Sequence, residues 1–187
     1  MTEIVIREAQ VMDAPVLLAI YRPYVEKTTI TFEYQVPTED VFAKRIQETL
    51  TRYPYLVAEV AGEVLGYAYA SVYKPREAYD WSCEVTVYVK QKGKARGVGS
   101  ALYRRLEALL AKQGICTLAA CITAGNEASV AFHQKWGYHQ VASFEHLGYK
   151  FGAWQDVLWF QKQLGTLPEN PPAFVPYPIL KATEKVW

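Results

Sequence analysis

Residues 83–100 read CEVTVYVKQKGKARGVGS, and they carry the strongest structural signal in the chain. The residues Cys83–Val89 combine β-branched and aromatic side chains, which are typical of a β-strand. Glycines and basic residues follow at 93–99, and beyond them leucines recur from Leu102 to Leu110 at the spacing of an amphipathic helix. The stretch therefore predicts a strand, a basic glycine-containing loop and a helix, in that order.

The loop is suited to bind an anion. Amides at the start of a helix have no partner within the helix, and glycines let a ligand approach the main chain closely. Lys94 and Arg96 add positive charge. We expect the anion to contact Lys94, Ala95, Arg96, Gly97, Val98, Gly99 and Ser100. An ordinary strand-to-helix turn with solvated basic side chains fits the loop chemistry equally well.

Two common phosphate-binding motifs do not match this loop. The P-loop needs a lysine between its last glycine and the following Ser or Thr, whereas Gly99 is followed directly by Ser100. The dinucleotide fingerprint needs a third glycine at the position of Leu102. Both nucleotide-binding folds are therefore excluded.

Strand and helix patterns continue on both sides of this stretch. Before it we expect a strand at 4–6, a helix capped by Asp13, a helix from a cap at Thr38 to about residue 51, and a hairpin of 55–60 and 64–70. After it we expect a strand at 116–122, a helix at 126–135 and strands near 138–144 and 157–161. The proline-rich residues 165–187 predict an extended tail that wraps the surface without a further element. No repeat or linker divides the chain, so residues 1–187 are expected to form one domain.

Composition limits the partners of the chain. Lys and Arg total 20 against 19 Asp and Glu, so no overall positive field favours nucleic acid or an anionic membrane. The N-terminal residues lack the apolar core of a signal peptide, and no apolar run is long enough to span a bilayer, so we expect a cytoplasmic protein. The cysteines Cys83, Cys116 and Cys121 lack the spacing of metal ligands, and we expect buried, reduced thiols and no metal.

The run Lys94–Gly99 resembles the Q/R-x-x-G-x-G/A signature of the GNAT family of N-acetyltransferases. Lys94 stands where the family usually has Gln or Arg, which keeps the charge of an arginine but loses its planar guanidinium. The resemblance extends over nearly the whole chain, because the segment order is similar to that of the family and 126–138 resembles its later cofactor-binding helix and the strand after it. More narrowly, the chain resembles the phosphinothricin and methionine sulfoximine acetyltransferases at 28–32, 52–54, 79–81, 84–89, 148–152 and 154–156.

The resemblance implies an α+β fold of the GNAT type, with a mixed, mostly antiparallel central sheet that is flanked by helices and splayed where acetyl-CoA binds. It implies that acetyl-CoA is the cosubstrate, that an amino-acid-like small molecule is acetylated on its α-amino group, and that the enzyme is a homodimer. Cofactor contacts are then expected from residues 94–100 and from Val87, Tyr88, Val89, Asn126 and Ser129.

The chemistry of amine acetylation selects candidate catalytic residues. An ammonium group must lose a proton, and a buried carboxylate with a raised pKa can accept it. Glu84 is the candidate, and the matching position in the resembling acetyltransferases is assigned as the base; a solvent-facing strand glutamate is the alternative. His133 stands where many family members have a tyrosine that protonates the departing thiolate, and a histidine titrates near neutral pH. A helix histidine that bonds a neighbour is equally compatible, and Tyr103 and Tyr138 are alternative acids.

An amino-acid acceptor needs cations for its carboxylate and a wall for its methylene chain. Lys74 and Arg76 precede the strand of Glu84 and are candidate cations, although exposed loop cations are usually solvated. The candidates for the wall are Phe32, Tyr79 and Trp81. Three functions remain open. They are a small-molecule acetyltransferase with an enclosed pocket, a protein or peptide N-acetyltransferase with an open groove, and a non-catalytic acyl-CoA sensor.

Overall fold

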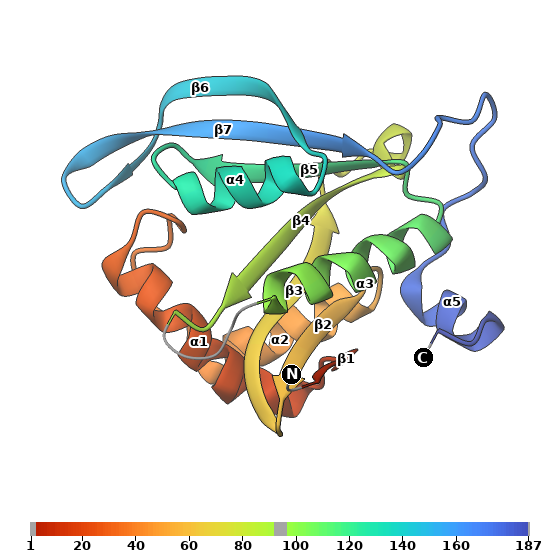
Figure 1. Cartoon of the computed structure of the whole chain (residues 1–187), viewed down its shortest axis with the longest axis horizontal. Helices are drawn as coiled ribbons and strands as arrows, with labels where there is room; N and C mark the ends of the chain where they lie inside the picture. The colour runs from red at the N-terminus through yellow and green to blue at the C-terminus, as the bar shows by residue number, and fades with distance from the viewer. Residues whose placement is uncertain (1–2, 92–96, 187) are drawn as a thin grey trace.

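The computed structural model describes residues 3–91 and 97–186 (Figure 1). Within them, a seven-stranded sheet has the order β1-β2-β3-β4-β5-β7-β6. Neighbouring strands are antiparallel except β4 and β5, which are parallel. The sheet is therefore mixed and mostly antiparallel, as the family resemblance implied.

The first half of the chain builds strands β1 to β4 and the helices that cover them. The strands are β1 Ile4–Glu8, β2 Tyr55–Val60, β3 Glu63–Val72 and β4 Ser82–Val89; the helices are α1 Ala14–Lys27 and α2 Glu39–Leu50, with 3-10 turns η1 Val11–Asp13 and η2 Glu77–Tyr79. The Thr38 side chain caps α2 by accepting from the Val41 amide, as predicted. Ala61 and Gly62 both have positive φ, 52° and 80°, which gives the β2–β3 turn the twist that a two-residue hairpin requires.

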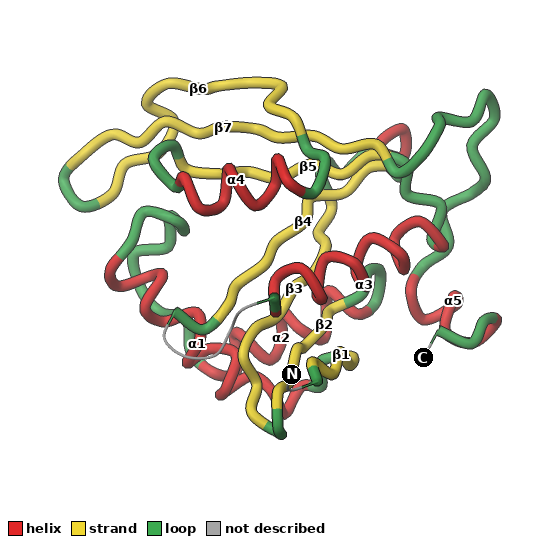
Figure 2. Tube along the Cα trace, viewed as in Figure 1, coloured by secondary structure: helices red, strands yellow, loops and turns green. Residues whose placement is uncertain are grey.

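The second half adds the remaining strands and three helices. They are α3 Val98–Lys112, β5 Thr117–Thr123, α4 Glu127–Lys135, β6 His139–Lys150, β7 Ala153–Gln163 and α5 Tyr177–Thr183. Figure 2 shows α3 and α4 in front of the sheet. The core on the side of α3 includes Leu56 of β2 and Ala68 of β3. Their neighbours along the chain, Val57 and Tyr67, point to the other face and pack with α1 and α2. Alternation along the strands thus divides the apolar side chains between two faces.

Strands β4 and β5 pair only briefly. Parallel pairs join 82–84 to 117–119 and then stop, although β4 continues to Val89 and β5 to Thr123. Figure 1 shows the two strands diverging from this seam, β4 toward α1 and β5 beside α4. The sheet is therefore open in its middle, which confirms the splayed sheet that the resemblance implied.

Strands β6 and β7 are longer than the sequence predicts and form an arm that reaches the end of α1. Near its tip, the buried Lys150 ammonium donates to the main-chain oxygens of Val25 at 2.8 Å and Thr31 at 2.7 Å. A Cβ on Gly148 would overlap the ring of Phe32, so glycine permits the close approach of the arm. The arm therefore holds the segment after α1, residues 28–33, over the open part of the sheet.

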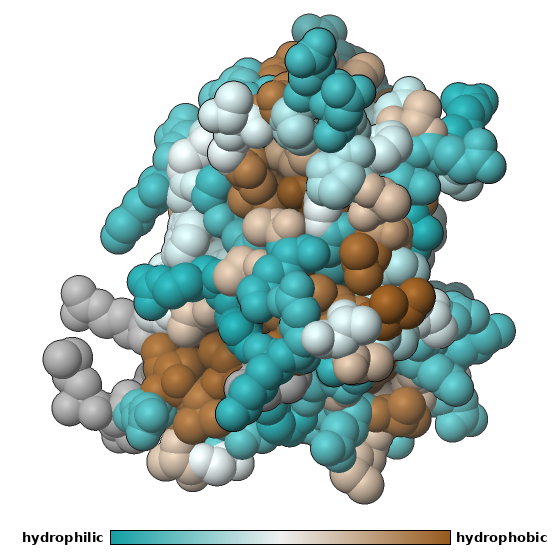
Figure 3. Space-filling view, turned by 90° about the vertical axis from the view of Figure 1, so that its right-hand side faces the viewer, coloured by the Kyte–Doolittle hydropathy of each residue, from teal (hydrophilic) through white to brown (hydrophobic). Residues whose placement is uncertain are grey.

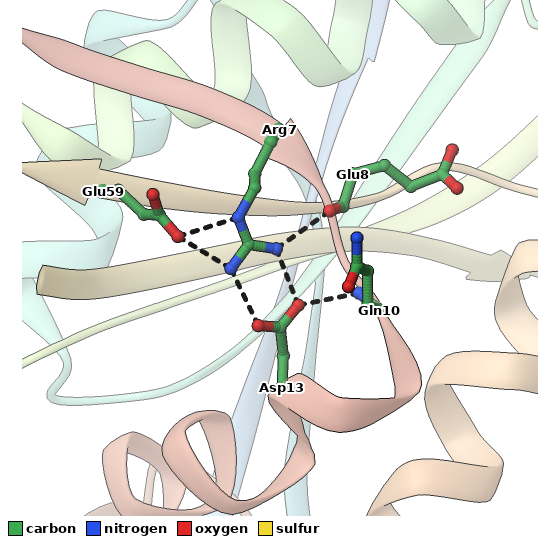
Figure 4. Close-up of polar contacts among 5 residues, drawn as sticks. All are labelled: Arg7, Glu8, Gln10, Asp13 and Glu59. Atoms are coloured by element: carbon green, nitrogen blue, oxygen red, sulfur yellow. Dashed lines mark hydrogen bonds and ion pairs between the residues drawn. The ribbon is translucent and has the colours of Figure 1, made fainter. Parts of the chain in front are cut away.

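Arg7 joins β1, β2 and the start of α1 (Figure 4). Its guanidinium donates to both carboxylate oxygens of Asp13 and to the carboxylate of Glu59, each at 2.7 Å. The main-chain N–H of Gln10 also donates to the Asp13 carboxylate, at 2.7 Å. Burial alone would raise the pKa of Asp13, but the bonds from Arg7 and Gln10 outweigh it and lower that pKa below its usual value. Asp13 precedes α1 as predicted, but its carboxylate pairs with Arg7 instead of capping the helix amides.

The C-terminal extension corrects one prediction, because its last part forms the helix α5. Pro176 and Pro178 lie at the start of this helix, where a missing amide costs nothing, and Tyr177 and Leu180 are buried one turn apart. The prolines therefore begin a short helix after an extended stretch. Figure 3 shows the side of the molecule that carries α5, where hydrophilic residues cover most of the face and hydrophobic residues lie in smaller groups.

The three cysteines differ in their burial. All three cysteines are free, but Cys83 is buried, Cys116 is half-buried and Cys121 is exposed, so the expectation of buried thiols is correct only for Cys83. Cys121 alternates onto the face of β5 opposite the α3 core. Within residues 3–91 and 97–186, no helix is both long and apolar enough to cross a membrane. In the same residues, no cluster of three or more His, Cys, Asp or Glu is placed to hold a metal ion.

Candidate active site

A cavity of about 330 Å³ lies beside the gap between β4 and β5; we call it the acceptor cavity. Alternation along β4 turns Glu84, Thr86 and Tyr88 toward it, on the side of α1 and α2. Tyr103 of α3 and His133 of α4 also line it, although both helices cover the opposite face. The cavity therefore reaches through the sheet at the gap.

Glu84 lies in the last pair of the β4–β5 seam, at the apex of the gap. Its side chain faces the acceptor cavity and the residue is half-buried. Burial raises the pKa of Glu84 above its usual value, and the positive charge of Lys74 partly opposes this rise. A carboxylate with a raised pKa is a stronger base than an exposed one, so Glu84 is suited to accept a proton from a group in the cavity.

A second cavity, of about 360 Å³, lies on the α3–α4 side of the gap; we call it the helix cavity. The first backbone bond of α3 runs from the Ala101 amide to the Gly97 carbonyl at 2.9 Å, so the amides of 98–100 have no partner within the helix. Gly97, Gly99 and Ser100 line the cavity, whereas the side chain of Val98 is buried in the core. This end of the cavity is suited to an anion.

The open edge of β4 turns main-chain groups toward the gap. The Lys90 amide donates to Leu65 of β3 at 2.8 Å, and the Tyr24 hydroxyl donates to the Val89 carbonyl at 2.5 Å. In an antiparallel pair, the main-chain N–H and C=O groups of successive residues point alternately to the partner strand and to the open edge. Val87 therefore presents its N–H and C=O to the gap, where it lines both cavities.

The two cavities meet at the gap. Ile30, Val87, Asn126 and Ser129 line both of them. Asn126 is held in place as the cap of α4, because its side-chain oxygen accepts from the Ser129 amide at 3.3 Å. A molecule in the helix cavity can therefore place its end group beside a molecule in the acceptor cavity.

His133 is buried and bonded through both ring nitrogens. Its Nδ1 lies 2.8 Å from the Ser129 carbonyl, which can only accept, so Nδ1 carries a proton. Burial lowers the pKa of His133 and favours the neutral ring. The other nitrogen, Nε2, then accepts from the Tyr103 hydroxyl at 2.9 Å. The neutral ring has no spare proton to donate, and the donor of this pair is Tyr103.

Comparison with known proteins identifies the family. A family model described as the acetyltransferase (GNAT) domain matches residues 6–159. The chain belongs to the GNAT acetyltransferases. This result confirms the resemblance found in the sequence.

Individual relatives narrow the assignment within the GNAT family. The chain is 37% identical to a phosphinothricin N-acetyltransferase of Streptomyces viridochromogenes, over 89% of this chain and 90% of that one. It is 35% identical to an L-methionine sulfoximine/L-methionine sulfone acetyltransferase of Pseudomonas aeruginosa, over 85% of this chain and 94% of that one. A crystal structure of a phosphinothricin acetyltransferase from Sinorhizobium meliloti in complex with AcCoA superposes with a TM-score of 0.86 at 31% identity, over 95% of this chain and 97% of that one. The chain is thus an N-acetyltransferase of the phosphinothricin acetyltransferase-like kind.

In this GNAT enzyme, the structure brings together most of the residues singled out in the sequence. Glu84, His133 and Phe32 line the acceptor cavity. Residues that line the helix cavity are Val87, Val89, Gly97, Gly99, Ser100, Asn126 and Ser129. Lys94, Ala95 and Arg96 lie outside the described residues.

Tyr88 was expected among the cofactor contacts, but it lies elsewhere. Its ring faces the acceptor cavity and packs on Tyr21 with centroids 4.9 Å apart. Its place in the β3–β4 register is opposite Tyr67, so its main chain turns toward β3 while its neighbour Val87 turns toward the gap. Strand alternation therefore separates Tyr88 from Val87 and Val89, which were predicted with it to contact the cofactor.

Four of the residues predicted around the acceptor do not line the acceptor cavity. Lys74 and Tyr79 line a separate groove with residues of β6 and β7, and Arg76 is exposed at the start of η2. The Trp81 Nε1 donates to the Pro172 carbonyl at 2.6 Å and ties the chain to the C-terminal extension. The connection between β3 and β4 passes the edge of the seam, so its side chains do not line the acceptor cavity. The charge of Lys74 still reaches Glu84 and lowers its pKa.

Several residues of the acceptor cavity were not found in the sequence. They are Tyr21, Thr31, Glu33, Arg45, Tyr69 and Cys121. The sequence could have indicated Tyr69, because Tyr67 and Tyr69 alternate along one strand and so place two hydroxyls on the same face of the sheet. Arg45 lies on an exposed helix position, and nothing in its local pattern distinguishes it from a solvated arginine.

Proposed function

We propose that this enzyme transfers the acetyl group of acetyl-CoA to the α-amino group of an amino-acid-like small molecule such as phosphinothricin or methionine sulfoximine. One observation carries the proposal. A half-buried carboxylate, Glu84, lies at the apex of the gap and lines the acceptor cavity, which shares four lining residues with a cavity suited to an anion. The names of the relatives point to the same class of acceptor.

The helix cavity fits acetyl-CoA in three respects. The amides at the start of α3, which have no partner within the helix, suit the pyrophosphate. The open edge of β4 at Val87 and Val89 suits the amide groups of the pantetheine arm, which would pair like an added strand. Residues shared with the acceptor cavity lie where the arm would end. When bound, acetyl-CoA supplies an acetyl group activated as a thioester.

Glu84 is proposed to act as the general base. Its carboxylate accepts a proton from the ammonium of the acceptor, directly or through one water, and the freed nitrogen attacks the thioester carbonyl. A C–N bond forms as the C–S bond breaks. The Val87 amide faces the gap and would donate to the carbonyl oxygen, where negative charge develops.

His133 is proposed to act through Tyr103. The neutral Nε2 of His133 accepts the single proton of the Tyr103 hydroxyl in the free enzyme and holds that hydroxyl at the gap. The hydroxyl would turn from Nε2 to donate to the departing sulfur when acetyl-CoA is bound. The second proton of the nitrogen passes to this sulfur, which leaves as a thiol. Tyr138 is a weaker candidate, because its hydroxyl donates to the Glu107 carboxylate at 3.0 Å within the core.

The test is release of free thiol from acetyl-CoA in the presence of a panel of amines. We expect turnover with phosphinothricin, methionine sulfoximine and methionine sulfone. Glu84→Gln should lower kcat by about 100-fold or more while acetyl-CoA still raises the Tm. Glu145→Gln, at an exposed strand position, is the matched control and should leave kcat unchanged.

Other outcomes of the same experiment identify the other two functions. Turnover only with peptides or protein N-termini would replace the proposal by a protein acetyltransferase. A Tm increase with acetyl-CoA but no turnover with any amine would favour a sensor. Full activity of Glu84→Gln would refute the role of the base while leaving the reaction itself in place.

We also propose that the enzyme is a homodimer. Val141, Phe144 and Leu147 are exposed apolar side chains that line a groove of about 460 Å³, and Tyr149 and Trp154 are further exposed aromatic side chains of β6 and β7. Apolar patches of this kind mark interaction surfaces. Light scattering should give twice the mass of the chain, and Phe144→Arg should halve it, whereas Val5→Arg at an exposed position of β1 should not.

A further inference from the structure

The gap between β4 and β5 is a wedge, because backbone pairing joins the two strands at one end only. The parallel pairs stop at Glu84 and Ala119, whereas β4 runs on to Val89 and β5 to Thr123. A strand-like ligand between the two strands needs about 10 Å, twice the usual spacing of neighbouring strands. The fit of such a ligand therefore depends on how far apart the two strand ends are held.

The end of α1 and the residues after it connect the two strand ends (Figure 1). At the last residue of β4, the Tyr24 hydroxyl donates to the Val89 carbonyl at 2.5 Å. At the last residue of β5, the Thr123 hydroxyl donates to the Thr29 carbonyl at 2.7 Å. Residues 24–29 thus lie across the open end of the wedge, and we call them the cross-bar.

The cross-bar is itself held in one conformation. The Thr28 hydroxyl, at the end of α1, donates to the Tyr24 carbonyl at 2.7 Å and accepts from the Ile30 amide at 3.2 Å. Such bonds between a side chain and the nearby main chain fix the local backbone. The Lys150 ammonium also donates to the Val25 carbonyl within the cross-bar. Together β4, β5 and the cross-bar therefore enclose the gap as a triangle whose third side has a fixed length.

The two residues that fasten the cross-bar are buried at the two cavities. Tyr24 is 8% exposed and lines the helix cavity, and Thr123 is 6% exposed and lines the acceptor cavity. Valine has nearly the shape of threonine, and phenylalanine could pack on Tyr88 as the Tyr24 ring does, with centroids 4.9 Å apart. Packing alone does not require either hydroxyl, so what the hydroxyls add is the connection between the strand ends.

We propose that Tyr24 and Thr123 are positioning residues that set the width of the gap through the cross-bar and so hold the acetyl-CoA arm in line with the acceptor amine. The inference rests on the proposed function, because that function places the arm in the gap. A gap held at its bound width before the ligand arrives costs less entropy on binding. Loss of either hydroxyl lets the strand ends move apart, which weakens acetyl-CoA binding and misaligns the reacting atoms.

The test measures the Kd of acetyl-CoA by calorimetry and kcat with methionine sulfone. Thr123→Val and Tyr24→Phe should each raise the Kd about fivefold and lower kcat about tenfold. Thr123→Ser keeps the hydroxyl and should restore most of both values. Thr183→Val is the matched control, because it removes a threonine hydroxyl that donates to the Ile179 carbonyl at 3.0 Å in α5, and it should change neither quantity.

The double variant distinguishes a shared cross-bar from two separate contacts. The two bonds act in series, so the loss of either one already disconnects the strand ends. Combining Thr123→Val with Tyr24→Phe should therefore raise the Kd little further than one change alone. Two independent contacts would instead multiply to about 25-fold.

The remaining outcomes overturn the inference or separate it from the proposed function. It is overturned if both single variants behave as the wild type, if Thr123→Ser behaves like Thr123→Val, or if the double variant shows the full product. If acetyl-CoA does not bind the wild type, both proposals fail. If it binds but no amine reacts, the acceptor assignment fails, and the Kd values still decide the role of the cross-bar. Melting curves establish that each variant is folded, as expected because the seam and the Tyr103–His133 bond remain.

Discussion

Lys150 offers a direct test of how the β6–β7 arm supports the acceptor cavity. Replacement by methionine keeps most of the side-chain volume but removes the ammonium, so the carbonyls of Val25 and Thr31 lose their donor. Leaving a buried acceptor without a partner costs about 1–3 kcal/mol. The wild-type ammonium is itself desolvated, and burial lowers the pKa of Lys150, which offsets part of this cost. We therefore expect Lys150→Met to lower the free energy of unfolding by about 2 kcal/mol.

Urea unfolding and thermal melting measure this loss. For a chain of this size, about 2 kcal/mol corresponds to a decrease in Tm of about 4–8 °C. The segment at 28–33 carries Thr31 and Phe32 into the acceptor cavity, so kcat/KM should also fall at temperatures far below the Tm. Lys135→Met, at an exposed position of α4, is the control and should change neither quantity.

A specific result would refute this reasoning. If the free energy of unfolding of Lys150→Met lies within about 0.5 kcal/mol of the wild-type value, the two hydrogen bonds add no net stability over the hydration that they replace. If stability falls as expected but kcat/KM stays the same, the arm stabilises the fold without shaping the cavity.

Three further changes have outcomes that follow from the contacts described. Lys74→Met should move the acidic limb of the kcat/KM profile to higher pH, because the lysine charge lowers the pKa of Glu84; an unmoved limb would contradict this. Asp13→Asn should cost about 1–3 kcal/mol at pH 7 by urea unfolding. The pKa of Asp13 is lowered in the fold, so the difference should shrink as pH falls through that pKa and should not grow. Gly148→Ala should displace the Phe32 ring and lower the free energy of unfolding by about 1–3 kcal/mol, and an unchanged Tm would show that the ring moves freely.

Much of the framework could be predicted because its signals are local. The strand at 83–89, the glycines before α3 and the cap at Thr38 each depend on residues close in sequence. Glu84 was proposed as the general base from the need for a carboxylate and from the family resemblance, whereas its position at the apex of the gap comes from the structure. The structure supplies a physical setting for it, a seam that ends at that residue and burial that raises its pKa.

The acceptor side could not be predicted because it depends on contacts between distant segments. Arg45 reaches the cavity only because α2 packs beside β3, and Lys150 bonds Val25 across a large separation in sequence. The arm was underestimated because register shifts between 144 and 148 interrupt the alternation that identifies a strand. Lys74 and Arg76 were expected near the acceptor from their distance in sequence to Glu84, but the turn before β4 carries them past the seam.

The unpaired edge of β4 has a consequence for hydrogen exchange. Amides that face β3, such as those of Thr86 and Tyr88, are held in a ladder, whereas beyond the β4–β5 seam those of Val87 and Val89 face the gap. Protection from deuterium should therefore alternate from one residue to the next along a single strand. A ligand that bonds to the exposed edge would slow exchange at every second amide and leave the others as they are, so the strand itself would report occupancy.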